Sequence, residues 1–598
     1  MERVASTMRR TTRALVALSA AGALALSACG GDGDDDGDNE PDAAPTATQE
    51  GGDTGDAQDP TREGPREIDG AEEGGTVKVI SVVPNETMHP SEIYYTHTYG
   101  VGSGLLFRSL TQYVIEDGVP VLVPDLATDT GTPNEDYTEW TFTIRDGVMW
   151  EDGTPVTAED VKRGMESAMD LETFPESPGF FSQEYFEGGA DYKGPYTDPG
   201  AQLDSIAVDG STLTITMSKP FPDMPYWGAF PANGPLPASA LDDPVAYGNA
   251  PLSTGPYKIA DYTPKKTLTL VRNDQWDPAS DPGRTQYPDG WEFDYTVPSE
   301  RIDETLLNDQ GDAQNTMTFD DVLGTNYRKF QEQAPDRLVP GATPCTRYWA
   351  VDMRKITDLS VRQAIALAYP TRSAIKAAGL IEGVNRYPAT ALLPPGIPGR
   401  VDYTVVEGMT PGTPDPAAAK ALLEQAGAVG FELKFLFPTD DPDSVNAKNA
   451  IVKGLEEAGF KATPIPTTLE NLTTDRENPN NDLNIRSAGW CSDWPSGGSW
   501  FPVLHKTEDV EALGQISQNY SLFSEPEVDQ RIDDILALPI EDQAAAWGEL
   551  DQYISETYLP LIPLTYDGVI SVHGSKVNGH ENDPTIGMPT FKGVWLTQ

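Results

Sequence analysis

The order of helices and strands between residues 415 and 466 constrains the fold more than any other feature of this sequence. Asp415 is a suitable helix N-cap, Pro416 fits the first helical position, and the run AAAKALLEQA ends at Gly427. The apolar stretch FELKFLFP then predicts a strand, SVNAKNAIVKGLEEA a second helix that ends at Gly459, and ATPIP a second, short strand. Because helices that alternate with strands cover a partly parallel sheet, we expect an α/β fold.

The N-terminal half adds a second pattern, which is typical of strands joined by tight turns. Apolar residues alternate along WTFTI at 140–144, which predicts one face of a strand. The Asp-Gly pairs at 146–147 and 152–153 predict a hairpin turn and a second turn. Thr157 then caps a helix, with Asp160 at the capping-box position.

Residues 1–28 have the layout of a secretory signal. MERVASTMRRTTR is basic, and the apolar run ALVALSAAGALALSA behind it is too short to span a bilayer. The run ends in LSACG at 26–30, which looks like a bacterial lipobox, so we expect residues 1–28 to be removed and Cys29 to carry lipid. Stable anchoring needs more than one acyl chain, and lipoprotein modification supplies more than one. The alternative is an ordinary signal peptide that contains a cysteine.

Residues 29–73 lack the apolar side chains that a folded domain needs. They consist mainly of Gly, Asp, Glu, Pro and Thr, so they cannot bury enough surface to offset the entropy of the chain. Like charges extend such a segment. We therefore expect a disordered acidic tether that holds a folded body away from the membrane.

Length and charge limit the classes of function. A chain of 598 residues can form two or three compact domains. The formal net charge of −53 argues against nucleic acid and anionic membrane surfaces as partners, because both repel an acidic protein. Solubility is the simplest use of so large a charge.

The sequence shows no arrangement of residues that points to catalysis, a metal or a cofactor. The five histidines do not pair at zinc-ligand spacing. The glycine-rich run YGVGSG at 99–104 lacks the lysine of a phosphate-binding loop and the spacing of a dinucleotide fingerprint or a nucleophile elbow. A close-packed helix start is the better interpretation of that run. We therefore expect no catalytic residues, no metal and no cofactor.

Six stretches of the chain carry a resemblance to a known family. They are GGTVKVI at 74–80, TFTIRDGVMWEDGTPVTAEDV at 141–161, STGPYKIADYTPKKTLTLVRNDQW at 253–276, DLSVRQAIALAY at 358–369, the helix at 415–427 and GWCSDW at 489–494. Together they resemble the extracytoplasmic solute-binding proteins of the oligopeptide/nickel type (family 5), which deliver substrates to ATP-driven (ABC) importers. The resemblance implies a two-lobed periplasmic-binding-protein-like fold (class II, cluster C) with an extra subdomain in the first lobe. Members of this family close their lobes around a ligand by a hinge motion.

The resemblance also implies a division of the chain into segments that cross between the lobes. The expected segments are the lipoprotein signal peptide at 1–28, the acidic tether at 29–73, the first segment of lobe 1 at 74–112, the extra subdomain at 113–205, the second segment of lobe 1 at 206–344, lobe 2 at 345–566, and the return segment of lobe 1 at 567–598. The chain is thus expected to enter and leave the second lobe once.

The two cysteines other than Cys29 are expected to form one disulfide. They are Cys345 in GATPCTRYW and Cys491 in GWCSDW. Two such cysteines in an exported protein are usually paired. The resemblance agrees, because some peptide binders of the family carry cysteines at both places and bridge the ends of neighbouring strands in the second lobe. Two free buried thiols are the alternative.

The resemblance assigns Asp493 of GWCSDW to the ligand. In peptide-binding members the acid of this motif pairs with the α-amino group of the ligand, and a carboxylate suits an ammonium in a water-poor site. The backbone around Gly489 and Trp490 would hydrogen-bond an extended peptide as a strand does. Because Gly489, Cys491 and Asp493 share one direction along a strand, the chain must bend beyond Cys491 to free Asp493. The alternative for Asp493 is a turn-capping role.

Two departures from the family's motif concern the far end of the ligand. Some oligopeptide binders use a basic residue two positions before the glycine, and this chain has Ser487 there. Arg486 is displaced by one position and should face the other way. The residues after the acid, WPSGG, contain no second acid. We retain Ser487 as a candidate ligand contact, and the length of the ligand stays open.

The sequence therefore predicts a lipid-anchored receptor on the extracytoplasmic face of the cell membrane. We expect it to capture oligopeptides in an interlobe cleft and to deliver them to an ABC permease. It should act as a monomer without catalytic activity, because other subunits hydrolyse the ATP. The same fold can bind a saccharide, a metal chelate or another cationic solute, since fold does not fix function. A ligand sensor or scaffold without an importer is a further alternative, and the missing catalytic arrangement disfavours an enzyme.

Overall fold

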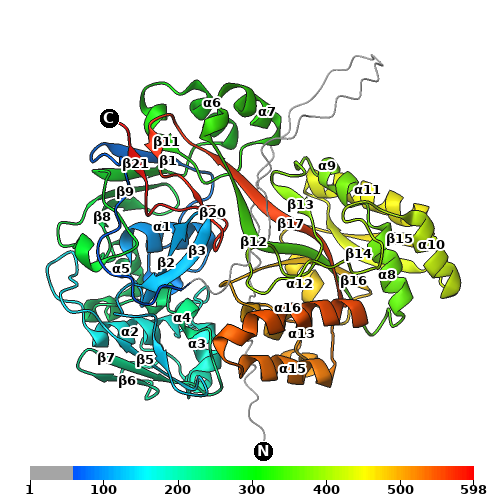
Figure 1. Cartoon of the computed structure of the whole chain (residues 1–598), viewed down its shortest axis with the longest axis horizontal. Helices are drawn as coiled ribbons and strands as arrows, with labels where there is room; N and C mark the ends of the chain where they lie inside the picture. The colour runs from blue at the N-terminus through cyan, green and yellow to red at the C-terminus, as the bar shows by residue number, and fades with distance from the viewer. Residues whose placement is uncertain (1–57) are drawn as a thin grey trace, which may run out of the picture.

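Two α/β lobes, joined by long strands, make up residues 58–598, which are the residues that the computed structural model describes (Figure 1). The predicted signal at 1–28, the lipid site Cys29 and the tether as far as residue 57 lie outside the described residues. The α/β prediction is confirmed. None of the helices within the described range combines the length and the apolar character that a bilayer crossing requires.

A five-stranded mixed sheet forms the centre of the first lobe. Its strands are β1 (Thr76–Ile80), β8 (Tyr257–Thr263), β9 (Thr267–Arg272), β10 (Gly290–Asp294) and β11 (Thr316–Met317). Their order is β11-β1-β10-β9-β8, with β1 parallel to β10 and β11 and the other pairs antiparallel. Val77 and Val79 are fully buried, while their neighbours in β1 are half-buried, which is the period-two pattern of a sheet packed on a core.

The extra subdomain contains a four-stranded antiparallel sheet. Its strands are β4 (Thr132–Pro133), β5 (Glu139–Thr143), β6 (Ile206–Asp209) and β7 (Thr212–Thr216), in the order β4-β5-β7-β6. Trp140 and Phe142 of β5 are buried in the core, as the alternation predicted. Because β7 pairs with β5 along its whole length, this sheet extends beyond residue 205, where the sequence placed the end of the subdomain.

The local predictions in the subdomain have mixed outcomes. Thr157 and Asp160 form a capping box at the start of α2 (Ala158–Ala168), as predicted. The Asp-Gly pair at 146–147 forms a turn but not the predicted hairpin. β5 pairs with β4 and β7 instead. The chain beyond this turn leaves the sheet, and the second Asp-Gly turn is flanked only by an isolated bridge between Met149 and Pro155.

Shorter elements complete the first lobe. Its other helices are α1 (Thr96–Val101), α3 (Phe180–Tyr185), α4 (Met224–Trp227), α5 (Pro244–Asn249), α6 (Ser299–Asn308) and α7 (Gly324–Gln333). Its other strands are β2 (Thr111–Glu116), β3 (Val119–Pro124), β18 (Val577–Asn578), β19 (Asn582–Asp583), β20 (Met588–Pro589) and β21 (Trp595–Leu596). The last four belong to the C-terminal return of the chain, whose end lies beside β1 in Figure 1.

Residues 58–73 run along the first lobe, although the sequence predicted disorder as far as residue 73. The backbone N–H of Asp59 donates to the carbonyl of Leu122 at 2.9 Å. Further along, the N–H of Ile68 donates to the hydroxyl of Tyr287 at 3.1 Å. Long-range hydrogen bonds to a folded neighbour hold this polar segment in place, and its composition gives no sign of them.

The second lobe is built on a four-stranded sheet and a parallel strand pair. The strands are β12 (Leu338–Val351), β13 (Arg386–Pro388), β14 (Glu432–Pro438), β15 (Lys461–Thr467), β16 (Ile485–Cys491) and β17 (Leu561–Val572). The sheet has the order β13-β17-β12-β16, and β14 pairs with β15 in parallel. The parallel arrangement predicted from residues 415–466 is thus confirmed, and Asp415 caps the preceding helix as expected.

Helices cover both faces of the second-lobe sheet. They are α8 (Leu359–Ala368), α9 (Thr371–Ala377), α10 (Pro416–Gln425), α11 (Pro442–Glu457), α12 (Leu472–Glu477), α13 (Phe501–His505), α14 (Val510–Leu513), α15 (Pro526–Leu536) and α16 (Ile540–Thr557). Trp349 and Val351 of β12 point into a core under α8 to α11, whereas Tyr348 and Ala350 point into a second core under α13, α15 and α16. The sheet therefore separates two hydrophobic cores.

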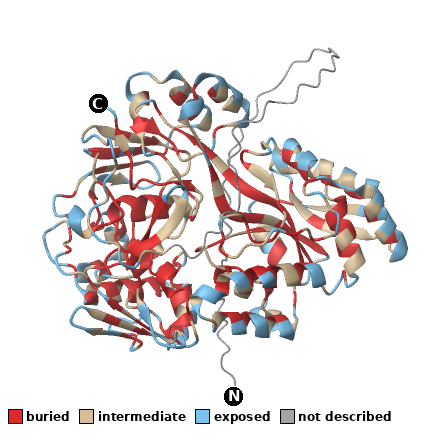
Figure 2. Ribbon diagram, viewed as in Figure 1, coloured by how far each residue is buried: buried red, intermediate tan, exposed pale blue. Residues whose placement is uncertain are grey.

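The strands β12 and β17 pass through both lobes and connect them. They pair antiparallel and are buried along most of their length (Figure 2). Their register shifts between Ala342 and Thr346. The segment boundaries that the sequence predicted at 344/345 and 566/567 fall inside these two strands. A register irregularity lets a strand bend, and this shift lies in the two strands that connect the lobes.

Candidate ligand-binding site between the lobes

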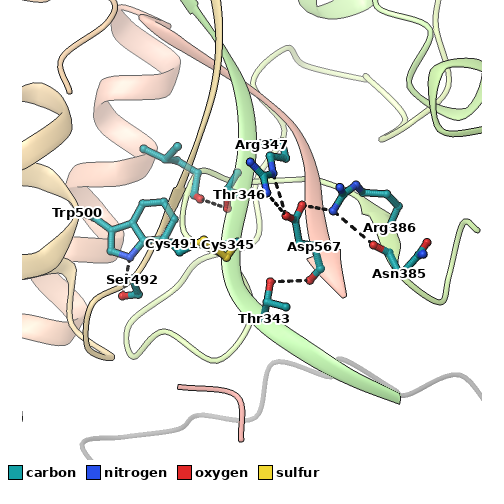
Figure 3. Close-up of a disulfide and its surroundings, with 11 residues drawn as sticks. Thr343, Cys345, Thr346, Arg347, Asn385, Arg386, Cys491, Ser492, Trp500 and Asp567 are labelled. Carbon is teal, nitrogen blue, oxygen red and sulfur yellow. Dashed lines mark hydrogen bonds and ion pairs between the residues drawn. A yellow bond between two sulfur atoms is a disulfide. The ribbon is translucent and has the colours of Figure 1, made fainter. Parts of the chain in front are cut away.

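The stretch GWCSDWPSG forms the end of β16 and the loop behind it. Among the described strands β16 pairs only with β12, so it is an edge of the sheet. The register sets Cys491 opposite Cys345 and Gly489 opposite Arg347. A disulfide joins Cys345 to Cys491, whose Cα atoms are 4.0 Å apart, and this is the pairing expected from the sequence. It ties the end of β16 to β12 at the point where the loop begins (Figure 3).

Alternation along β16 separates two neighbouring side chains. Arg486 is completely buried and forms an ion pair with Asp352 at 3.1 Å, whereas Ser487 is exposed. The carbonyl of Ser487 accepts a hydrogen bond from Arg476 at 3.2 Å. The prediction that Arg486 faces away from Ser487 is confirmed, so Arg486 is held in the second-lobe core by its carboxylate partner.

Asp493 lies in a bend two residues beyond the end of β16. Its Oδ1 accepts a hydrogen bond from the hydroxyl of Tyr94, a residue of the first lobe, at 2.6 Å. Its Oδ2 is inaccessible to solvent and has no hydrogen-bond partner among the described residues. No backbone N–H of the described chain donates to this carboxylate, so the turn-capping alternative finds no support. Asp493 thus contacts both lobes and keeps one oxygen unpartnered.

Burial controls the charge of Asp493. Removal from water disfavours the ionised form, and the hydrogen bond from Tyr94 offsets only part of this effect, so the pKa of Asp493 rises from 3.8 to about 7. Burial, and next the charge of Asp493, raise the pKa of the Tyr94 hydroxyl well above 10.0, which keeps it a proton donor. A cation next to Oδ2 would favour the ionised carboxylate again.

Gly489 and Trp490 lie near the end of β16, four and three positions before Asp493. The indole N–H of Trp490 donates to the carbonyl of Ser499 at 2.9 Å, and its ring packs against the second-lobe core. A Cβ atom at Gly489 would lie 2.7 Å from Cδ of Arg347. A larger residue at this position would have to displace the side chain of Arg347, which crosses directly above it.

Arg347 is a candidate site residue that no sequence motif indicates. Its Nε donates to Asp567 at 2.8 Å, and Arg386 pairs with the same carboxylate (Figure 3). Two guanidinium groups thus share one carboxylate, and 27% of the Arg347 side chain remains exposed. The charge of Asp567 is the main cause that raises the pKa of Arg347 above its ordinary value. Only the register of β12 against β16 reveals this cation beside Gly489.

Trp494 packs into the core of the first lobe, although it belongs to a loop of the second. It is 2% exposed, and its ring centroid lies 4.9 Å from that of Phe181 in an edge-to-face contact. Its indole N–H donates to Oδ2 of Asp223 at 2.7 Å. No local pattern in the sequence indicates this role of Trp494, since the contact joins residues 271 positions apart.

The arrangement is suited to binding. A carboxylate with one unpartnered oxygen is enclosed where the two lobes meet, two residues beyond the end of an edge strand. Groups of three or more His, Cys, Asp or Glu side chains placed to hold a metal ion do not occur among residues 58–598. The chemistry that this geometry offers is the capture of a cationic group between the lobes.

Known proteins resemble this chain over most of its length. The model of the bacterial extracellular solute-binding proteins, family 5 Middle, matches residues 121–510. The periplasmic oligopeptide-binding protein OppA of Salmonella typhimurium (strain LT2) is 24% identical over 452 residues, which cover 72% of this chain and 77% of that protein. The probable deoxycholate-binding periplasmic protein YgiS of Escherichia coli K12 is 23% identical over 451 residues, 73% of this chain and 79% of YgiS.

Solved structures show the same fold. The structure titled clavulanic acid biosynthesis oligopeptide binding protein 2 superposes with a TM-score of 0.80 at 23% identity, and the match covers 90% of this chain and all of that one. The two-lobed fold predicted from the sequence is thereby confirmed. Since the family model also spans well over half of the sequence, the chain belongs to family 5 of the bacterial extracellular solute-binding proteins, whose members serve ABC importers.

Proposed function

We propose that the protein is a lipid-anchored receptor of an ABC importer and that it captures peptides by their α-ammonium group. The supporting observation is Asp493, whose Oδ2 is buried and unpartnered where the lobes meet. An ammonium group at Oδ2 would supply both a hydrogen bond and a countercharge where water is excluded. The names of OppA and of the clavulanic acid biosynthesis oligopeptide binding protein agree with a peptide ligand.

The edge strand β16 favours a peptide over a small amine. An extended peptide can add to a free strand edge through main-chain hydrogen bonds. The backbone of Gly489 and Trp490 lies three to four residues before Asp493 along this edge. The carbonyl of Ser487 already accepts a hydrogen bond from Arg476. A peptide that begins at Asp493 could therefore pair with the edge of β16 only as far as Ser487.

Arg347 is suited to the other end of such a peptide. Its partly exposed side chain lies above Gly489, four positions before Asp493. Its Nε and Nη2 pair with Asp567, and its Nη1 would donate to a ligand carboxylate. Four residues of extended chain span roughly 13 Å at most. A peptide of about three or four residues therefore fits between Asp493 and Arg347.

The remaining parts of the proposal concern the protein as a whole. It acts as a monomer on the extracytoplasmic face of the membrane, held by lipid on Cys29, and other subunits hydrolyse ATP. Binding alone is the task of this chain. A non-peptide solute that carries a cationic amine is the competing ligand class, because Asp493 recognises the ammonium and not the rest of the molecule.

The test compares a free with a blocked N-terminus. Native mass spectrometry of the purified protein first identifies a bound peptide, and calorimetry then measures its affinity with and without N-terminal acetylation. Loss of a desolvated charge pair costs on the order of 2–5 kcal/mol, so acetylation should weaken binding roughly thirtyfold to several-thousandfold. Equal affinity of the two peptides would overturn the assignment of Asp493 as an amine site.

A further inference from the structure

Phe180 is the one aromatic residue among the large hydrophobic side chains that the described chain leaves exposed. It is 40% exposed at the start of α3, whereas its neighbour Phe181 is 6% exposed. Single exposed apolar residues are common on protein surfaces, so exposure alone carries no meaning. The position of this ring relative to Asp493 is what distinguishes it.

The ring of Phe180 lies next to Tyr94, the residue that donates to Asp493. Its centroid is 6.0 Å from that of Tyr94 in an edge-to-face contact, and the hydroxyl of Tyr94 donates to Asp493. The centroid of the Phe181 ring lies 4.3 Å from that of Phe180, and Phe181 also packs edge-to-face against Trp494. The first turn of α3 thus buries the ring of Phe181 against the loop that carries Asp493 and leaves the ring of Phe180 partly exposed beside Tyr94.

The distances fit a single amino-acid residue. The path from Oδ1 of Asp493 through the Tyr94 side chain to the ring of Phe180 spans on the order of 10 Å. A residue whose ammonium group is hydrogen-bonded to Asp493 can place an aromatic side chain at the centroid separation of about 4.5–7 Å that aromatic pairs adopt. Such a contact would cover a ring that water now reaches.

We propose that Phe180 is the contact for the side chain of the first residue of the peptide, so that the protein prefers peptides with an aromatic or large apolar N-terminal residue. This inference rests on the proposed function, because Asp493 must first fix the ammonium group. The exposed ring offers apolar surface and an aromatic partner to the side chain of the first ligand residue only. It leaves the contacts of the later residues unchanged.

The experiment measures a ratio of affinities. Calorimetry gives the affinities of Phe-Ala-Ala and Ala-Ala-Ala, and of the corresponding tetrapeptides, for the parent and for Phe180→Ala. The parent should bind the Phe-first peptides roughly tenfold more tightly than the Ala-first ones. In Phe180→Ala this ratio should fall to about one, while the Ala-first peptides should bind as they do to the parent. Phe180→Leu should retain part of the preference, because it keeps apolar area without the ring.

A matched control and the contrary outcomes separate this inference from the proposed function. Val245→Ala removes a side chain that is 75% exposed on α5, and it should leave the ratio unchanged. An unchanged ratio in Phe180→Ala, or an equal loss for Phe-first and Ala-first peptides, overturns the role of Phe180 even where acetylation still weakens binding. If none of these peptides binds the parent, both the proposed function and this inference are overturned.

Discussion

Replacing Trp494 with alanine should shift the protein toward separated lobes. The indole is 2% exposed, lies 4.9 Å from the ring of Phe181 and donates to Asp223, and both partners belong to the first lobe. Truncation of a buried tryptophan costs about 3–5 kcal/mol. Because these contacts exist only while the loop lies on the first lobe, most of this loss falls on the closed arrangement. The ratio of closed to open molecules should therefore fall by roughly 10²–10³-fold.

Small-angle X-ray scattering without added ligand measures this shift directly. The Trp494→Ala variant should have a larger radius of gyration than the parent protein. Its affinity for a peptide should also be lower, because part of the binding free energy is then used to close the lobes. Saturating peptide should bring the two radii together again.

Two further variants test the reasoning. Trp494→Phe keeps a ring in the pocket and removes only the N–H donor to Asp223, so its effect should be smaller, about 1 kcal/mol. Leu513→Ala, at a second-lobe position that is 55% exposed, controls for the loss of an apolar side chain elsewhere. Equal radii and equal peptide affinities for the parent and Trp494→Ala would refute the argument that this residue holds the lobes together.

Three other predictions concern charge, cross-linking and anchoring. If Asp493 binds the ammonium as proposed, peptide affinity should rise with pH through about 7, because the ionised carboxylate is the binding form and burial keeps the carboxyl protonated below that pH. Asp493→Asn should bind weakly at every pH, and a pH profile like that of the parent would contradict this assignment. Serine at both Cys345 and Cys491 should lower the free energy of unfolding by about 2–5 kcal/mol in chemical denaturation, and equal stability would show that the disulfide adds nothing. Cys29→Ala should leave the exported protein in the soluble fraction, and its retention in the membrane pellet would show a different anchor.

Local patterns predicted the parts of the fold that local forces determine. The caps at Asp415 and Thr157 and the parallel strands β14 and β15 follow from residues a few positions apart. The bend that frees Asp493 from β16 was expected for the same reason, since side chains alternate along a strand. The order of the segments came from the resemblance to a family and not from these patterns.

Contacts between segments that are distant in the sequence could not be predicted from local patterns. Tyr94 and Asp493 are 399 positions apart, so no local sequence pattern predicts the hydrogen bond between them. Arg347 became visible only through the pairing of β12 with β16. The ordered segment at 58–73 was misjudged because its composition is that of a disordered chain, whereas its hydrogen bonds are made to a neighbour that is already folded.

Two kinds of interlobe contact act in opposite directions in this molecule. The docking of Trp494 favours closed lobes whether or not a ligand is bound. Closing also encloses the unpartnered oxygen of Asp493, and burying an unpaired carboxylate costs several kcal/mol while it is ionised. A ligand cation beside Asp493 removes this cost by pairing with the carboxylate. The free energy gained by closing around a ligand is therefore largest above the pKa of Asp493, where the carboxylate is ionised. Affinity, closure and pH dependence are therefore coupled through one side chain.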